Sequence, residues 1–230
     1  MSQQQIPLAL KPPRRPGFDN FIAGPNRAVV ETLARGLEPG DWYFLGGPPG
    51  SGRSHLLSAC FGERLQAAVS VSFVSLTMSE QIELLDHAGG EWVMVDDIDV
   101  LAGDREAEIR LFNALNRWRG ERTGVIMSGV GRDRFELPDL RSRLGQATRL
   151  TLKPLEEDDF RRLIQRLAAD HEVLLGRGAA DYLIKRAPRS PAAIARLMEQ
   201  LATRALSERR TISVPLAREV MTGEAGDGGR

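Results

Sequence analysis

Residues 47–54 read Gly-Pro-Pro-Gly-Ser-Gly-Arg-Ser, between a short apolar run at residues 42–45 and a helical pattern that begins at Ser54. The spacing matches the phosphate-binding loop G-x-x-x-x-G-K-[ST], or P-loop, except that Arg53 replaces the lysine. Glycines let backbone N–H groups turn inward around a phosphate, and the first turn of the following helix adds partial positive charge. A glycine-rich turn without a ligand is the alternative interpretation of this stretch.

An acidic strand end supplies the second half of the predicted site. Residues 92–95 form another apolar run, and Asp96 and Asp97 follow it. Beside a P-loop, an acid at the end of such a strand binds Mg²⁺, and a second polar group orients the attacking water. We assign these two roles to Asp96 and Asp97 respectively. A solvated strand end is the alternative for the acids alone, but their position downstream of the loop favours the metal and catalytic roles.

We expect these motifs to bind ADP or ATP together with Mg²⁺. The loop residues assigned to the nucleotide are Gly47, Gly50, Ser51, Gly52, Arg53, Ser54 and His55. Ser54 is also assigned to Mg²⁺ through its hydroxyl. Because arginine is bulkier than lysine and planar, we expect Arg53 to permit nucleotide binding and to slow hydrolysis by the chain itself.

Short apolar runs alternate with helical patterns through residues 18–153. Strands are predicted at residues 42–45, 69–76, 92–95, 125–127 and 148–152. Helices are predicted at residues 54–65, 79–86 and 106–118. Strands that alternate with helices indicate an α/β fold in which a parallel five-stranded sheet lies between helices.

The remainder of the chain reads as helical. Acidic residues at 156–159 favour a helix start, a second helix is predicted at 179–186, and Ser-Pro at 190–191 is typical of a helix cap and first turn. We therefore expect an α/β core at residues 18–153 and a small all-helical lid at residues 154–222.

The two ends of the chain have a different composition. Residues 1–17 are rich in proline and glutamine and show no helical or strand period, which predicts a flexible arm. Residues 223–230 are rich in glycine and predict a disordered tail.

The overall composition is typical of a soluble globular protein, with 42% apolar and 27% charged residues. Lys plus Arg and Asp plus Glu both number 31, and this balance argues against non-specific nucleic-acid binding as the main function. Cys60 is the single cysteine, so an internal disulfide is excluded. We find neither an apolar run of membrane-spanning length nor a signal-peptide pattern, and we expect a cytoplasmic protein.

With these motifs in place, the chain resembles the AAA+ module of the bacterial replication initiator DnaA. Residues 18–27, Phe-Asp-Asn-Phe-Ile-Ala-Gly-Pro-Asn-Arg, are similar to the segment that helps to enclose the adenine in that family, and this assigns Ile22 to the nucleotide. Residues 137–144, Leu-Pro-Asp-Leu-Arg-Ser-Arg-Leu, resemble the motif with an arginine finger. The resemblance implies that Arg143 acts in trans, on the nucleotide of a neighbouring molecule.

Two positions depart from the family pattern. Ser128 follows the fourth strand at the sensor position, but Val130 stands where an acidic residue is expected shortly after it. The sensor arginine of the lid is matched best by Arg189, while an alternative alignment places Ala192 there. The resemblance therefore implies at most a weak ATPase in this chain.

The chain ends before the DNA-binding domain of the initiator, and such a module resembles the Hda family, the regulatory inactivator of DnaA. Members of that family bind the sliding clamp, the beta subunit of DNA polymerase III, and promote hydrolysis of DnaA-bound ATP, which negatively regulates initiation. Residues 5–10 are similar to the family's Q-x-x-L-x-L clamp-binding peptide, which assigns that role to Gln5, Leu8 and Leu10. The resemblance implies contact with DNA only through the clamp and leaves a homo-oligomer open.

Two other functions remain open at this point. An autonomous ATPase, such as a helicase loader or a clamp-loader-like subunit, is favoured by the acid pair at 96–97 and opposed by Arg53 and Val130. A DNA-binding paralogue of the initiator is opposed by the net charge of zero.

Overall fold

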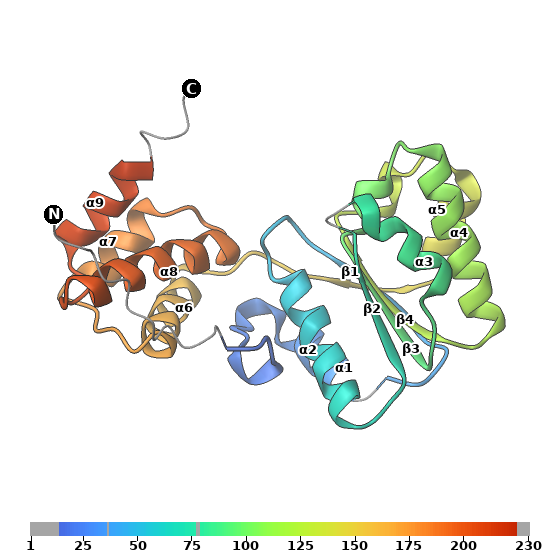
Figure 1. Ribbon diagram of the computed structural model, residues 1–230, viewed down its shortest axis with the longest axis horizontal. Coiled ribbons are helices and arrows are strands. Elements are labelled where there is room, and N and C mark those ends of the chain that lie inside the picture. Colours follow the sequence, from blue (N-terminus) through green and yellow to red (C-terminus); the bar gives the residue numbers. More distant parts are fainter. Residues whose placement is uncertain (1–13, 36, 77–78, 225–230) are drawn as a thin grey trace, which may run out of the picture. The chain divides into compact units, whose positions relative to one another are not determined.

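The computed structural model describes residues 14–35, 37–76 and 79–224, so the proposed clamp-binding residues Gln5, Leu8 and Leu10 lie outside the described residues. The chain divides into two units. We call Pro16–Pro154 the core and the part from Leu155 onward the lid, and we describe each by itself. Figure 1 shows the course of the chain.

The core contains a five-stranded sheet in which all neighbouring strands run parallel, as predicted. The strands are β1 (Trp42–Gly46), β2 (Val71–Ser75), β3 (Trp92–Asp96), β4 (Gly124–Gly129) and β5 (Thr148–Thr151). Their spatial order is β2-β3-β4-β1-β5. The register pairs Val95 with Met127 and Leu45 with Ser128, so the carboxyl ends of the three central strands meet at one edge.

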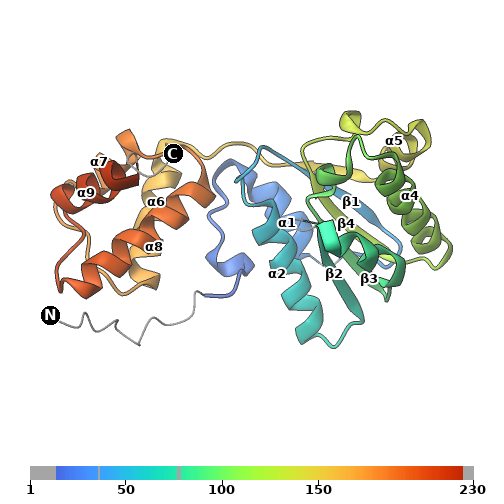
Figure 2. The same cartoon turned by 45° about the horizontal axis from the view of Figure 1, so that its top comes forward.

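Helices cover both faces of the sheet (Figure 1 and Figure 2). One face carries α1 (Arg27–Ala34) and α2 (Arg53–Gln66). The other carries α3 (Leu84–His87), α4 (Arg105–Gly120) and α5 (Pro138–Leu144). Short 3-10 helices occur at η1 (Phe18–Asn20), η2 (Gly24–Asn26), η3 (Ser79–Glu83), η4 (Ile98–Leu101) and η5 (Arg132–Arg134).

Alternation along the strands explains the two apolar layers of the core. Phe44 packs in the cluster beneath α4, whereas Leu45 packs in the cluster beneath α2. Met94 also belongs to the cluster beneath α2. Because side chains two residues apart in a strand share a face, Asp96 lies on the face that carries α2.

The helical segment predicted at residues 79–86 is present, but it is not one continuous α-helix. The structure has the 3-10 helix η3 followed by the single turn α3. Arg117 donates to the carbonyls of Leu85 and Ala88, and the indole N–H of Trp118 donates to the Ala88 carbonyl at 2.8 Å. These side chains satisfy the carbonyls at the end of α3, and Ala88 adopts an extended backbone there.

The lid consists of α6 (Glu157–Asp170), α7 (Ala179–Arg186), α8 (Pro191–Ser207) and α9 (Val214–Glu224). The first three match the predicted helices, and the Ser190 hydroxyl accepts from the Ala193 amide at the start of α8. The sequence interpretation missed α9, which ends at Glu224 and so includes the first two residues of the predicted tail. Residues 225–230 lie outside the described residues.

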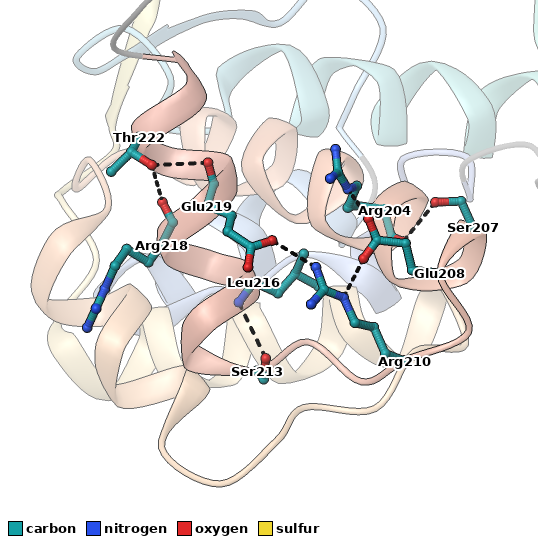
Figure 3. Close-up of polar contacts among 9 residues, drawn as sticks. All are labelled: Arg204, Ser207, Glu208, Arg210, Ser213, Leu216, Arg218, Glu219 and Thr222. Atoms are coloured by element: carbon teal, nitrogen blue, oxygen red, sulfur yellow. Dashed lines mark hydrogen bonds and ion pairs between the residues drawn. The ribbon is translucent and has the colours of Figure 1, made fainter.

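Charged side chains join the end of α8 to α9 (Figure 3). Glu208 pairs with Arg204 of α8 and with Arg210, whose guanidinium also lies 2.9 Å from Glu219 of α9. These side chains are partly exposed, so the network orients the connection and adds little to stability. None of the helices in the described ranges is long and apolar enough to cross a membrane.

A buried carboxylate fixes the loops at one end of α4. Glu108 is 0% exposed and accepts hydrogen bonds from the backbone N–H groups of Gly103, Glu136 and Leu137, at 3.0, 2.9 and 2.7 Å. Burial alone would raise the pKa of Glu108, but the three N–H donors hold it below its ordinary value. Glu108 thereby holds the chain that leads into α5.

Glu108→Ala is expected to lower the free energy of unfolding by about 2–5 kcal/mol, because it leaves three backbone donors without their acceptor. Urea denaturation followed by circular dichroism measures this loss. Glu106→Ala is the matched control, since Glu106 is exposed on the same helix, and it should change stability by about 1 kcal/mol or less. Equal midpoints for the two variants would contradict the role given to Glu108.

Candidate nucleotide site

The loop at residues 47–52 follows β1 and adopts conformations that require glycine. Gly50 and Gly52 have φ values of 74° and 100°, in the left-handed region that side chains disfavour. Gly52 is also the cap of α2, so the free N–H groups of the first helical turn open next to it. A Cβ atom at Gly52 would lie 2.7 Å from Cε2 of Phe21. Side chains are therefore disfavoured at positions 50 and 52 of the loop.

The segment before α1 packs against the start of α2. The rings of Phe21 and His55 lie 5.3 Å apart, and Nε2 of His55 lies 3.0 Å from the Gly17 carbonyl. A carbonyl only accepts, so Nε2 carries a proton, and burial lowers the pKa of His55 despite the opposing hydrogen bond to Gly17. Ile22, half-buried, follows Phe21 directly. The structure thus brings the segment assigned to the adenine next to the loop.

The acidic strand end is held by Ser128 from the neighbouring strand. Asp96 is 4% exposed and accepts from the Ser128 hydroxyl at 2.5 Å. The same hydroxyl oxygen accepts from the Asp97 amide at 2.9 Å. Since a hydroxyl has a single proton, Ser128 cannot also donate to a phosphate in this arrangement. Its geometry is that of a group which orients Asp96 and Asp97.

Arg53 pairs with two carboxylates beyond the strand end. Its Nη2 lies 2.7 Å from Oδ1 of Asp97, and its Nη1 lies 3.6 Å from Oδ2 of Asp99. Asp99 in turn accepts from the backbone amides of Val130 and Gly131, the latter at 3.4 Å. Burial, and then the charge of Asp96, raise the pKa of Asp97, while Arg53 opposes the shift. One carboxylate oxygen of Asp97 is therefore bound to Arg53, and the side chain is 29% exposed.

Among the residues that the structure describes, two buried polar atoms at the loop have no hydrogen-bond partner. They are Nη1 of Arg53, whose side chain is only 8% exposed, and Oγ of Ser51. Buried polar groups are nearly always satisfied, so such atoms call for an explanation. A phosphate group would accept from the Ser51 hydroxyl, and together with the glycines this fits the loop to a phosphate, whereas Nη1 of Arg53 already lies 3.6 Å from Oδ2 of Asp99. The Ser54 hydroxyl and the Asp96 carboxylate are oxygen donors of the kind that Mg²⁺ takes.

Arg143 lies on α5, on the face of the sheet opposite α2 (Figure 1). Its guanidinium donates to Oδ1 of Asn116 at 2.5 Å and to Oε1 of Gln146 at 3.3 Å. Among the ion pairs of the described residues, none joins Arg143 to Asp139, the acid one turn earlier. Both acceptors are neutral amides, so Arg143 keeps its positive charge uncompensated by them.

Arg189 of the lid lies in the turn between α7 and α8. Its side chain is 74% exposed, and its Nη2 lies 3.9 Å from Oε2 of Glu157. Ala192, the alternative at the sensor position, is exposed in the first turn of α8. Both residues lie at the same helix start, so the lid geometry leaves the choice between them open.

Comparison with known proteins identifies the lid. The family model described as "Hda, lid domain" matches residues 156–221. The lid of this chain is therefore Hda-like. Domain III of DnaA from Thermotoga maritima is similar over 94% of this chain and 98% of its own, with a TM-score of 0.76 and 16% identity.

Other solved structures share the fold at comparable identity. DnaA from Aquifex aeolicus bound to AMPPCP has a TM-score of 0.66 and 19% identity, over 84% of this chain and 66% of its own. The RuvB Holliday junction branch migration motor of Thermotoga maritima has a TM-score of 0.64 and 19% identity, over 85% and 68% of the two chains. At these identities the likeness establishes the AAA+ fold.

Three residues of the site were missed by sequence reasoning. Asp99 could have been included from the sequence, because it is the third acid of the run Asp-Asp-Ile-Asp at residues 96–99. Phe21 lies inside the segment that was singled out, but its contact with Gly52 depends on chain packing. Asn116 lies inside a predicted helix, and nothing in its neighbourhood of the sequence points to Arg143.

Proposed function

We propose that this protein binds an adenine nucleotide at residues 47–54, docks on the sliding clamp and promotes hydrolysis of ATP bound to DnaA. It would thereby act as a negative regulator of replication initiation in the cytoplasm. The observation that carries the proposal is the Hda lid match at residues 156–221. The glycine loop, its two unsatisfied polar atoms and the AMPPCP-bound DnaA relatives support the nucleotide part.

Arg143 is the residue that we propose to act on the partner. Hydrolysis builds negative charge on the transferred phosphoryl group, and a guanidinium supplied from a neighbouring molecule stabilises that charge. Because α5 and α2 cover opposite faces of the sheet, Arg143 is not part of its own chain's loop. The contact with Asn116 fixes one Nη atom and orients the guanidinium.

The nucleotide bound by this chain would stabilise its fold and would be hydrolysed slowly. Arg53 lies 2.7 Å from Oδ1 of Asp97 and so occupies one of the two oxygens that could orient a water. The alternative, an autonomous ATPase, is favoured by the position of Asp96 and Asp97 at the strand end beside the loop. It requires Asp97 to orient the water while Arg53 holds Oδ1 of the same carboxylate.

The proposed function is tested by following DnaA-bound ATP with and without this protein and DNA-loaded clamp. We expect rapid hydrolysis only when both are present, and slow turnover by this protein alone. Fast turnover by the isolated protein with no effect on DnaA would support the alternative ATPase instead.

Clamp docking is proposed for Gln5, Leu8 and Leu10 of the arm. A peptide that offers one polar and two apolar anchors to a groove loses most of its affinity when anchors are truncated. Gln5→Ala with Leu8→Ala should weaken clamp binding by about 100-fold or more, as measured by surface plasmon resonance. ADP binding should not change.

Gln3→Ala with Gln4→Ala is the matched control, because these residues lie outside the peptide motif. This control should bind the clamp normally. Wild-type affinity in the Gln5 and Leu8 variant would refute the assignment of the arm.

A further inference from the structure

A hollow of about 210 Å³ opens in the core, away from the nucleotide site. Its lining consists of Phe44, Arg132, Leu144, Gly145, Ala147 and Arg149. Phe44 and Leu144 belong to the apolar cluster beneath α4 and α5, so the hollow lies on the face of the sheet opposite α2. The phosphate-binding loop and its acids do not contribute to it.

Glycines make room for the two guanidinium groups of the hollow. The Arg149 guanidinium lies 5.8 Å from the centre of the Phe44 ring, and Cβ atoms at Gly46 and Gly131 would come within 3.7 and 3.9 Å of its Nη2. A Cβ at Gly145 would overlap Nη1 of Arg132. A side chain at position 145 would therefore displace Arg132, whereas a Cβ at position 46 or 131 would only reach van der Waals contact with Arg149.

The charge of these arginines is poorly compensated. Arg132 has an acid at 3.9 Å, Asp133, but that side chain is 90% exposed. For Arg149, the described residues provide no ion pair. Two arginines that converge on one hollow favour a carboxylate or a phosphate, which they bind through paired hydrogen bonds.

Size and polarity distinguish between these ligands. The hollow is smaller than the ~300–1,000 Å³ of typical small-molecule sites, so it suits one side chain better than a nucleotide. Its floor is apolar, with Phe44, Leu144 and Ala147. A glutamate or aspartate side chain offers methylene groups to such a floor and a carboxylate to the arginines, whereas a phosphate has no apolar part.

The hollow adjoins the proposed arginine finger. Leu144 and Gly145 of its lining directly follow Arg143 at the end of α5. A partner that brings its nucleotide to Arg143 would therefore also cover the hollow. We propose that the hollow is a docking pocket for an acidic side chain of the AAA+ partner whose nucleotide Arg143 reaches. This inference rests on the proposed function.

The test titrates ATP-loaded DnaA against the full-length protein on DNA-loaded clamp and measures the rate of ATP hydrolysis. Arg132→Ala with Arg149→Ala should raise the half-saturating DnaA concentration at least tenfold and leave the maximal rate unchanged. Arg143→Ala, by contrast, should abolish the maximal rate of hydrolysis. Arg134→Ala is the matched control, because Arg134 is exposed on η5 beside Arg132 and outside the lining.

Thermal melting and ADP binding of each variant check the fold, and the single variant Arg149→Gln replaces the double variant if the latter is unfolded. An unchanged half-saturating concentration, with Arg143→Ala inactive, would overturn the pocket alone. A fall in the maximal rate without a change in half-saturation would also overturn it. Failure of the unmodified protein to stimulate DnaA would overturn the proposed function and the pocket's role together.

Discussion

Arg143→Ala is expected to remove the stimulation of DnaA-bound ATP hydrolysis, with a loss of rate on the order of 10³ to 10⁵. In the role proposed for Arg143, the guanidinium contributes positive charge when charge develops on the transferred phosphoryl group, and alanine offers none. Single-turnover hydrolysis of radiolabelled ATP on DnaA, with DNA-loaded clamp present, measures the loss. The variant should still fold, bind ADP and bind the clamp.

Two neighbouring positions serve as controls for Arg143. Arg141 is exposed two residues earlier, and residues two apart on a helix point in different directions, so Arg141→Ala should retain most of the stimulation. Asn116→Ala frees the Arg143 guanidinium from its 2.5 Å contact and should give an intermediate rate of stimulated hydrolysis. Asn113→Ala, on the exposed side of α4, should leave that rate unchanged. Full stimulation by Arg143→Ala would show that the finger is another residue.

Gly52→Val is expected to abolish nucleotide binding. Gly52 has a φ of 100°, and a Cβ there would lie 2.7 Å from the Phe21 ring, so valine both strains the loop and displaces the segment beside it. ADP stabilises the native protein by mass action, by about 2.7 kcal/mol at a hundredfold excess over its Kd. The valine variant should show no ADP-dependent rise in melting temperature.

Gly62→Ala provides the matched control on the same helix. A Cβ at Gly62 would meet nothing within 4 Å, and alanine favours a helix interior over glycine by about 0.5–1 kcal/mol. This variant should keep the full ADP-dependent shift and melt slightly higher than the native protein. If Gly52→Val kept its shift as well, the loop at residues 47–52 would not be the binding site.

The sheet was predictable because each buried parallel strand is a short apolar run, such as residues 92–95, between segments of helical period. The parts of the site that are contiguous in sequence were predictable for the same reason. The glycine loop follows β1 and Asp96 is the last residue of β3, and their position at one sheet edge follows from parallel pairing.

Contacts between distant segments were not predictable. Asp97 has a left-handed backbone with a φ of 56°, and this turn is what brings Asp97 and Asp99 to Arg53. Aspartate adopts this conformation more readily than most residues, but the local sequence does not require it. The cooperation of Ser128 with Asp96 likewise depends on strand register.

The sequence interpretation also missed two features of the helices, the 3-10 helix η3 and the helix α9. Residues 79–86 have a helical pattern, yet Arg117 and Trp118 from α4 take the carbonyls at the end of α3. The helix α9 begins at Val214-Pro215, and its apolar residues Leu216, Ala217, Val220 and Met221 have a helical spacing that the sequence interpretation overlooked. Its buried residues Leu216 and Ala217 pack in the lid cluster, so tertiary contacts stabilise it.

Calorimetric titration of ADP with Mg²⁺ into the full-length protein tests the central claim most directly. The glycine loop, the start of α2 and the unsatisfied atoms of Ser51 and Arg53 predict saturable binding at one site per chain. The absence of binding heat at several temperatures, together with an unchanged melting temperature in saturating ADP, would contradict the claim that residues 47–54 hold a nucleotide.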